Sequence, residues 1–249
     1  SLPELLMAEK LGFKGEQIMF SSNDTPAEEF KKAKQLGAII NLDDISHIEF
    51  LEKTAGIPNL ICLRYNPGPA RKGNEIIGKP EEAKYGLTRE QMIEAYNILK
   101  RKGVKRFGMH TMIISNELNE SYFIETARMM FELAVEVYQK TGVKVEFINL
   151  GGGIGIPYKP EDKPVSYEKI VDGVKKAYND VIVKNKLNPI SIFTECGRVI
   201  TGPYGYLVTR VRHMKHTYKD YAGTDASIAN LIRPAMYGAY HHITILSKE

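Results

Sequence analysis

The segment Glu146–Tyr158, EFINLGGGIGIPY, joins an apolar run to three consecutive glycines, Gly151, Gly152 and Gly153. An apolar run that ends in a glycine cluster is typical of a buried strand followed by a turn. Glycine costs conformational entropy wherever the backbone is ordered, so its repeated use needs a reason. Either the turn is too tight for Cβ atoms, or a ligand comes close to the backbone. The segment by itself leaves both interpretations open.

Short apolar segments alternate with amphipathic segments on both sides of this stretch. Near-continuous apolar strands are typical of parallel sheets covered on both faces. The pattern therefore predicts about six β-then-α units. The expected strands are QIMFSS (17–22), AIINLDD (38–44), NLICLRYNPG (59–68), RFGMHTMI (106–113), VEFINLGGG (145–153) and SIFTECGR (191–198). Two expected helices have a capping-box spacing at their starts, Thr25 with Glu28 and Thr88 with Gln91.

Two architectures fit such units, a doubly wound sheet and a (β/α)8 barrel, and both place their chemistry at the carboxyl ends of the strands. A barrel has eight strands, and the chain opens on a helix-like segment, SLPELLMAEKLG (1–12). A barrel therefore implies that its first two β/α units are missing. Beyond Arg198 the pattern changes, because YGYLVTRVRHMKH (204–216) alternates like a half-exposed antiparallel strand. We expect a partial barrel over 1–202 and the beginning of a β-domain over 203–249.

The composition argues against several classes of protein. The 249 residues are 43% hydrophobic and 26% charged, as in ordinary globular proteins, and the net charge of +4 is spread without a basic tract that alternates with aromatics. We therefore expect no nucleic-acid partner and, since no apolar run could span a bilayer, no membrane. Two cysteines, Cys62 and Cys196, are too few for a disulfide framework and favour the cytoplasm. The histidine pairs lack helical metal-site spacing, so we expect no metal: His213 with His216, and His241 with His242.

The glycine cluster does not match the dinucleotide-binding fingerprint. In that motif a third glycine stands at the sixth position, but counting from Gly151 this position is Ile156, and counting from Gly153 it is Tyr158. Pro157 also delays any following helix. A looser possibility remains, in which successive glycine N–H groups form a concavity for a single phosphate.

Two further segments carry charged residues in apolar surroundings. In TECGR, Glu195 follows an expected strand, where a buried carboxylate needs a cationic partner. That partner is either Arg198, in a structural ion pair, or a protonated ring nitrogen of a ligand. In DASIANLIRPAMY (225–237), Arg233 suits bidentate binding of a carboxylate, although a surface arginine beside a turn is the alternative.

Taken together and in this order, NLGGGIG, ECGR and DASIANLIRPAMY resemble the fold-type III pyridoxal-phosphate decarboxylases, and most closely the diaminopimelate decarboxylases. Weaker echoes extend the resemblance through essentially the whole chain. It implies an alanine-racemase-like TIM-type barrel, pyridoxal 5'-phosphate as cofactor, and decarboxylation of meso-diaminopimelate to L-lysine in lysine biosynthesis. It also implies a cytoplasmic homodimer with shared active sites. The alternatives are ornithine, arginine or carboxynorspermidine decarboxylases, and a non-catalytic homologue that acts as a binding or regulatory module.

The resemblance also implies roles for individual residues. Glu195 would bind the pyridine nitrogen, and a second set would hold the substrate carboxylates: Arg198, Arg233 and Tyr237. The remaining cofactor contacts would come from His110, Met112, Ser115, Gly151, Gly152, Gly153, Gly197 and Arg198, with the glycines at the phosphate.

Three departures from the family pattern stand out. Met112 replaces a histidine that stacks on the cofactor ring, and Cys196 replaces a proline. The Schiff-base lysine of the family belongs on the first barrel strand, ahead of Ser1, and no lysine of this chain matches it. We therefore expect the chain by itself to be inactive.

Overall fold

The computed structural model describes residues 1–73 and 78–246, and its main feature is a parallel six-stranded sheet. The strands lie side by side in chain order: β1 (Met19–Ser22), β2 (Ile39–Leu42), β3 (Leu60–Arg64), β4 (Arg106–His110), β5 (Phe147–Gly152) and β6 (Ser191–Glu195). A doubly wound sheet reverses its strand order at a switch point. The unbroken order therefore excludes that architecture and confirms the predicted partial barrel.

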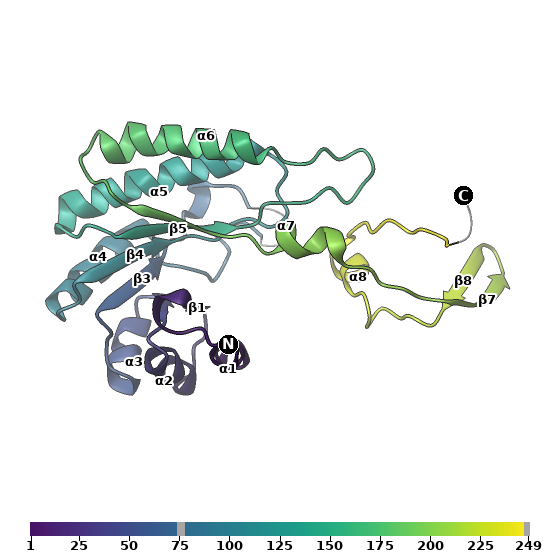
Figure 1. Cartoon of the computed structure of the whole chain (residues 1–249), viewed down its shortest axis with the longest axis horizontal. Coiled ribbons are helices and arrows are strands. Elements are labelled where there is room, and N and C mark those ends of the chain that lie inside the picture. Colours follow the sequence, from purple (N-terminus) through teal and green to yellow (C-terminus); the bar gives the residue numbers. More distant parts are fainter. Residues whose placement is uncertain (74–77, 247–249) are drawn as a thin grey trace.

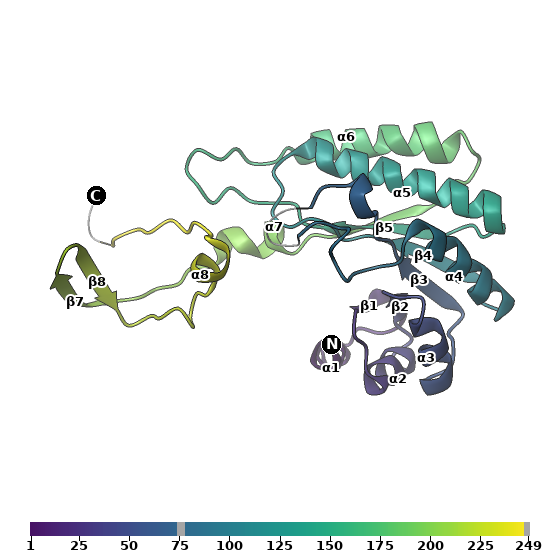
Figure 2. The ribbon, with the colours of Figure 1, turned by 180° about the vertical axis from the view of Figure 1, so that it is seen from behind.

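Helices follow the strands and lie around the outside of the curled sheet (Figures 1 and 2). They are α1 (Leu2–Lys10), α2 (Ala27–Gln35), α3 (His47–Thr54), α4 (Arg89–Arg101), α5 (Glu120–Thr141) and α6 (Tyr167–Tyr178), which continues into a π-helical turn, η3 (Asn179–Val183). Short 3-10 turns, η1 (Gly15–Gln17) and η2 (Gly68–Ala70), lie in the connections. No helix within the described ranges has the length and hydropathy required to cross a membrane.

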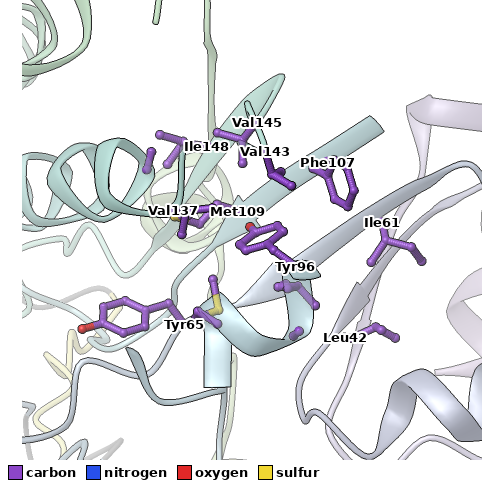
Figure 3. Close-up of a cluster of buried hydrophobic side chains, with 14 of the residues drawn as sticks. Leu42, Ile61, Tyr65, Tyr96, Phe107, Met109, Val137, Val143, Val145 and Ile148 are labelled. Atoms are coloured by element: carbon purple, nitrogen blue, oxygen red, sulfur yellow. The ribbon is translucent and has the colours of Figure 1, made fainter. Parts of the chain in front are cut away.

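The main core lies between the outer face of the sheet and the helices. Alternate strand residues such as Leu42, Ile61, Met109 and Ile148 point outward into this core, where each is fully buried. Figure 3 shows these side chains packed around Tyr96, whose hydroxyl donates to the carbonyl oxygen of Gly108 at 2.8 Å. Burying a large aliphatic side chain contributes about 1.5–3 kcal/mol, so this layer holds the strands in their register.

The opposite, inner face of the sheet carries a second and smaller apolar layer. Ile39, Leu60, Cys62 and Phe147 pack together there, with Met19 beside them. The ring of Phe147 stacks on that of Phe193 with 4.7 Å between centroids. These residues form an apolar floor near the amino-terminal ends of the strands, and burial raises the pKa of the Cys62 thiol well above its ordinary value.

One of the two predicted capping boxes is present. Thr88 accepts from the backbone N–H of Gln91, and the Gln91 side chain accepts from the N–H of Thr88. The prediction for Thr25 was wrong, because α2 begins one residue later than expected, with Pro26 at its N-cap. The Thr25 hydroxyl instead donates to the carbonyl oxygen of Ser22, which ties the helix start to the end of β1.

In the part of the chain that the structure describes, the sheet ends at two unpaired edges, β1 and β6, and has two strands fewer than a closed (β/α)8 barrel. Among the described residues β6 pairs with β5 alone, and most of its residues are exposed. Phe193, which faces the barrel interior, keeps 38% of its surface exposed.

Beyond β6 the chain leaves the sheet and forms an extended arm (Figures 1 and 2). Its elements are α7 (Arg198–Thr201), η4 (Gly202–Tyr204), the antiparallel strands β7 (Val211–His216) and β8 (Asp220–Thr224), and α8 (Arg233–Tyr237). The antiparallel strand was predicted, but its half-exposed character was not confirmed, since all six residues of β7 are exposed. The division of the chain at residues 202 and 203 stays a prediction.

Candidate active site

A ring of polar side chains lies on the inner face of the sheet, directly above the apolar floor. Successive side chains of a strand point to opposite faces, so residues two positions apart share one face. Asn149 stands two residues after Phe147, and the same step applies on the other strands. The polar residues placed in this way are Ser21, Asn41, Arg64, His110, Asn149 and Glu195.

The Glu195 carboxylate lies at the end of β6 and interacts mainly through one oxygen. Asn149 donates from Nδ2 to Oε1 at 2.9 Å. Nε2 of His110 lies 3.1 Å from the same Oε1, close but not aligned as a hydrogen bond. Partial burial raises the pKa of the Glu195 carboxyl, but His110, Asn149 and the charge of Arg64 outweigh burial, so the pKa lies below its ordinary value. Glu195 is therefore an anion at neutral pH.

Arg64 connects three loops that leave the carboxyl ends of neighbouring strands. Its guanidinium donates to Asp43 Oδ1 at 2.8 Å and to the carbonyl oxygen of Met112 at 3.1 Å. The other oxygen of Asp43 accepts from the backbone N–H of Gly86 at 3.2 Å. Both charged side chains are largely buried, and each has its partner, so this ion pair fixes the loops rather than binding a ligand.

The three consecutive glycines are required by the close approach of neighbouring backbones. A Cβ atom at Gly151 would stand 2.2 Å from the carbonyl oxygen of Thr111, and one at Gly152 would stand 2.2 Å from that of Glu195. A Cβ at Gly153 would stand 2.4 Å from the carbonyl oxygen of Ile114. Gly151 and Gly153 also have positive φ angles of 73° and 88°. The tight-turn interpretation of the opening segment is therefore sufficient, and a phosphate at these glycines stays a proposal.

Met112 and Gly197 flank this loop in different ways. The Met112 sulfur accepts from the backbone N–H of Gly152 at 3.2 Å, so the side chain lies against the glycines. Gly197 has an ordinary φ of −84°, and nothing lies within 4 Å of the position that a Cβ would take. Close contacts within the chain therefore explain why Gly151 to Gly153 lack side chains. No such contact explains Gly197, and the space beside it is open.

A second cluster, here called the arginine cluster, joins the barrel to the arm. Arg198 and Arg233 each donate to the hydroxyl of Tyr158, at 2.9 and 3.1 Å. Both guanidinium groups also lie over the Tyr158 ring, at 5.7 and 5.0 Å from its centroid. Arg198 further donates to the Ser115 hydroxyl at 3.2 Å, and Arg233 lies 3.3 Å from Nε2 of His241. Burial, followed by the two arginine charges, lowers the pKa of His241, which leaves its imidazole neutral at neutral pH.

The arginine cluster has an excess of positive charge. Among the described residues, neither Arg198 nor Arg233 forms an ion pair with a carboxylate. This arrangement differs from the structural pair of Glu195 with Arg198 that the sequence allowed. Two like charges held near one hydroxyl favour binding of an anion between them.

The structure brings most of the predicted site residues to one end of the barrel, but not all of them. The carboxyl ends of β4, β5 and β6 bring together Glu195, His110, Met112 and the glycines, while Arg233 reaches the same end of the barrel from the arm. Tyr237 is 43% exposed, and its hydroxyl makes no hydrogen bond within the described part of the chain. Sequence reasoning missed several polar residues that lie within strands or in the loops after them, and their polarity was the available signal: Asn41, Asp43, Arg64, Asn149 and Tyr158.

A model of a known family matches residues 1–202, under the description "Pyridoxal-dependent decarboxylase, pyridoxal binding domain". The chain belongs to this decarboxylase family. Its curated relatives include the protein TabA of Pseudomonas amygdali pv. tabaci, with 34% identity over 97% of this chain and 56% of that protein. They also include the diaminopimelate decarboxylase of Methanothermobacter thermautotrophicus, with 33% identity over 98% of this chain and 58% of that enzyme. The chain therefore spans little more than half the length of these relatives.

Solved structures of the family share the fold. Diaminopimelate decarboxylase of Helicobacter pylori, complexed with L-lysine, superposes with a TM-score of 0.85, at 25% identity over 100% of this chain and 62% of that chain. The enzyme of M. jannaschii, in co-complex with L-lysine, gives 0.84 at 28% identity, over 96% of this chain and 57% of that chain. The family resemblance and the barrel expected from the sequence are both confirmed.

The residues present fit pyridoxal phosphate, the cofactor of this family. Oε1 of Glu195 has Asn149 and His110 as neighbours, whereas Oε2 has no hydrogen-bond partner in the described ranges. The side chain is 42% exposed, so Oε2 is accessible to a protonated ring nitrogen. Beside Gly197 nothing lies within 4 Å of a Cβ position, so its backbone is open to a ligand group such as a phosphate.

Replacing Gly151 and Gly197 in turn tests whether each glycine is needed for packing within the chain. We expect Gly151→Ala to lower the free energy of unfolding by at least about 1–3 kcal/mol, since φ is positive and a carbonyl oxygen blocks the Cβ. Gly197→Ala is the matched control and should change it by less than about 0.5 kcal/mol. Urea denaturation followed by circular dichroism measures both, and equal losses in the two variants would contradict the packing account.

The lowered pKa of Glu195 predicts a specific pH dependence of stability. A carboxyl whose pKa is lower in the folded state contributes stability above its unfolded pKa, about 4.3, and this is lost as the pH falls through the folded pKa. Glu195→Gln should therefore lose less stability than the unmodified chain on acidification through this window. Urea titrations at several pH values measure the difference, and parallel curves for the two proteins would argue against an ionised, stabilised Glu195.

Proposed function

We propose that the protein is a pyridoxal-phosphate-dependent amino-acid decarboxylase that converts meso-diaminopimelate to L-lysine. The observation that carries the choice of substrate is the arginine cluster, in which Arg198 and Arg233 meet at Tyr158 without a carboxylate partner among the described residues. A diacid substrate supplies carboxylates for these cations. The similarity to several diaminopimelate decarboxylases supports the same choice.

The chain supplies binding and charge placement for this reaction. Glu195, ionised at neutral pH, would hold the pyridine nitrogen of the cofactor protonated. Gly151, Gly152 and Gly153, with Gly197 and Arg198, would surround the phosphate, and Met112 would lie near the ring because its sulfur rests on the glycine loop. When bound, pyridoxal phosphate supplies the electron sink that accepts the pair left behind when carbon dioxide departs.

Substrate carboxylates would be held by the arginine cluster. Arg198 and Arg233 would turn from the Tyr158 hydroxyl to a carboxylate, a charge-assisted contact about twice as strong as a neutral hydrogen bond. Tyr237, four residues after Arg233 on α8, would add a hydroxyl from the same helix. Holding the distal carboxylate would orient the substrate and would exclude substrates that lack this group.

The Schiff-base lysine would come from outside this chain. None of the hydrogen bonds and ion pairs described around Glu195, Arg198 and Arg233 involves a lysine. The sheet also lacks two strands of a closed barrel, and a family barrel places that lysine on its first strand. We propose that residues 1–202 form most of the cofactor-binding barrel and that residues 203–249 begin the β-domain.

We further propose a cytoplasmic homodimer with shared active sites. Both cysteines are free, in agreement with a reducing compartment. The arm exposes large apolar side chains that need cover, including Tyr206 at 87% and Leu246 at 77%. Ornithine, arginine or carboxynorspermidine decarboxylation, and a non-catalytic binding role, are the alternatives.

Assays of the complete gene product distinguish these functions. With pyridoxal phosphate added, we expect the visible absorbance band of a Schiff base, and release of carbon dioxide from meso-diaminopimelate but not from ornithine or arginine. Absence of the band in the complete protein would contradict any decarboxylase function. A band with preference for ornithine or arginine would overturn the substrate assignment alone.

Arg233 tests the role of the arginine cluster. We expect Arg233→Met to raise KM for meso-diaminopimelate about 10- to 100-fold, because a hydrogen bond to a charged group contributes about 1.5–3 kcal/mol. Arg212→Met, on the exposed strand β7, removes the same charge far from Tyr158 and should leave KM unchanged. Equal values of KM in the two variants, measured by steady-state kinetics, would remove Arg233 from the substrate site.

A further inference from the structure

His110 is enclosed between an amide and a carboxylate that come from different strands. It lies at the end of β4 with 2% of its surface exposed, and Asn41, on β2, is 1% exposed. Nδ1 of His110 lies 3.1 Å from Nδ2 of Asn41, while Nε2 lies 3.1 Å from Oε1 of Glu195. The imidazole therefore bridges a strand near one edge of the sheet and the strand at the other edge.

The contact with Asn41 decides which imidazole nitrogen carries the proton. An amide nitrogen only donates hydrogen bonds, and Nδ2 of Asn41 also donates to the Ser21 hydroxyl at 2.8 Å. Nδ1 of His110 must therefore accept, which leaves the single proton of a neutral imidazole on Nε2. This is the nitrogen that faces Glu195.

The opposite orientation of the Asn41 amide is less favourable. Its oxygen now lies in a buried position without a hydrogen-bond partner. Rotating the amide by half a turn would place the NH2 group there, with two donors unsatisfied in place of one acceptor. Buried donors without partners are rarer in proteins than acceptors without partners, so the orientation with Nδ2 toward His110 is favoured.

A neutral His110 suits the role of Glu195. Asn149 donates to Oε1 of Glu195, and Nε2 of His110 lies 3.1 Å from the same oxygen. With its proton on Nε2, a neutral imidazole would be a polar neighbour of Oε1 that leaves the charge of the carboxylate uncancelled. A doubly protonated imidazole would form an ion pair with the carboxylate and compete with the ring nitrogen for it. Oε2, which has no such neighbour in the described ranges, remains for the cofactor.

We propose that Asn41 and His110 are positioning residues: Asn41 fixes the Nε2–H tautomer of His110, and His110 together with Asn149 holds Glu195 with its Oε2 toward the cofactor. The part that concerns the cofactor rests on the proposed function, whereas the tautomer does not. Asn41 therefore acts on the reaction without touching the cofactor: it contacts His110, and His110 contacts Glu195.

Long-range proton–nitrogen NMR of the isotope-labelled 249-residue chain tests the tautomer directly. The resonances of His110 are assigned by their loss in His110→Gln. We expect the Nε2–H pattern in the unmodified chain at neutral pH. In Asn41→Asp the new carboxylate accepts from Nδ1, so both ring nitrogens should be protonated. The control Asn97→Asp, on α4, makes the same charge change away from the site and should leave the pattern unaltered. A proton on Nδ1 in the unmodified chain would overturn the proposal.

Binding of pyridoxamine 5'-phosphate, followed by its fluorescence, tests the effect on the carboxylate without a Schiff base. We expect Asn41→Asp to weaken binding about tenfold relative to Asn97→Asp, since the charge of Glu195 is then paired within the protein. Equal affinities in the two variants would overturn the positioning role. If the complete gene product does not bind the probe at all, the cofactor assignment fails, while the NMR result still decides the tautomer.

Discussion

The pairing of six parallel strands in chain order is the constraint on which the site depends. Hydrogen bonds between neighbours fix the register, and the register places Asn149 beside His110 and Phe193 beside Asn149. Because side chains alternate between faces, an apolar residue on the inner face is followed two positions later by a polar one. The site is therefore one layer of a barrel interior, and it lies on an apolar floor.

Close backbone packing and open space occur side by side at the end of β5 and β6. Three glycines let the carbonyl oxygens of Thr111, Ile114 and Glu195 approach the loop, and none of them needs a ligand to explain it. Their cost in conformational entropy is offset by the tight docking of neighbouring strand ends. Gly197, which follows the next strand of the sheet, differs from these three glycines, because nothing lies within 4 Å of the position that its Cβ would take.

Charge is distributed unevenly over the site, and this follows from the partners of each group. The Asp43–Arg64 pair is satisfied and buried, so it holds loops together. Asn149 and His110 lie beside one oxygen of Glu195, and the arginine cluster shares the hydroxyl of Tyr158. One carboxylate oxygen and two guanidinium groups without carboxylate partners among the described residues thus remain available at one end of the barrel.

The sequence by itself determined the alternation of strands and helices, the barrel class and the strand-end positions of Glu195, His110 and the glycines, because local patterning and short motifs carry that information. It misplaced the start of α2, where contact of Thr25 with the end of β1 prevailed over helix-capping preference. Only the tertiary structure revealed that Asn41 reaches His110 across 69 residues, and that Tyr158 joins Arg198 to Arg233. Those contacts depend on strand register and on the return of the arm to the barrel, which no local stretch of sequence encodes.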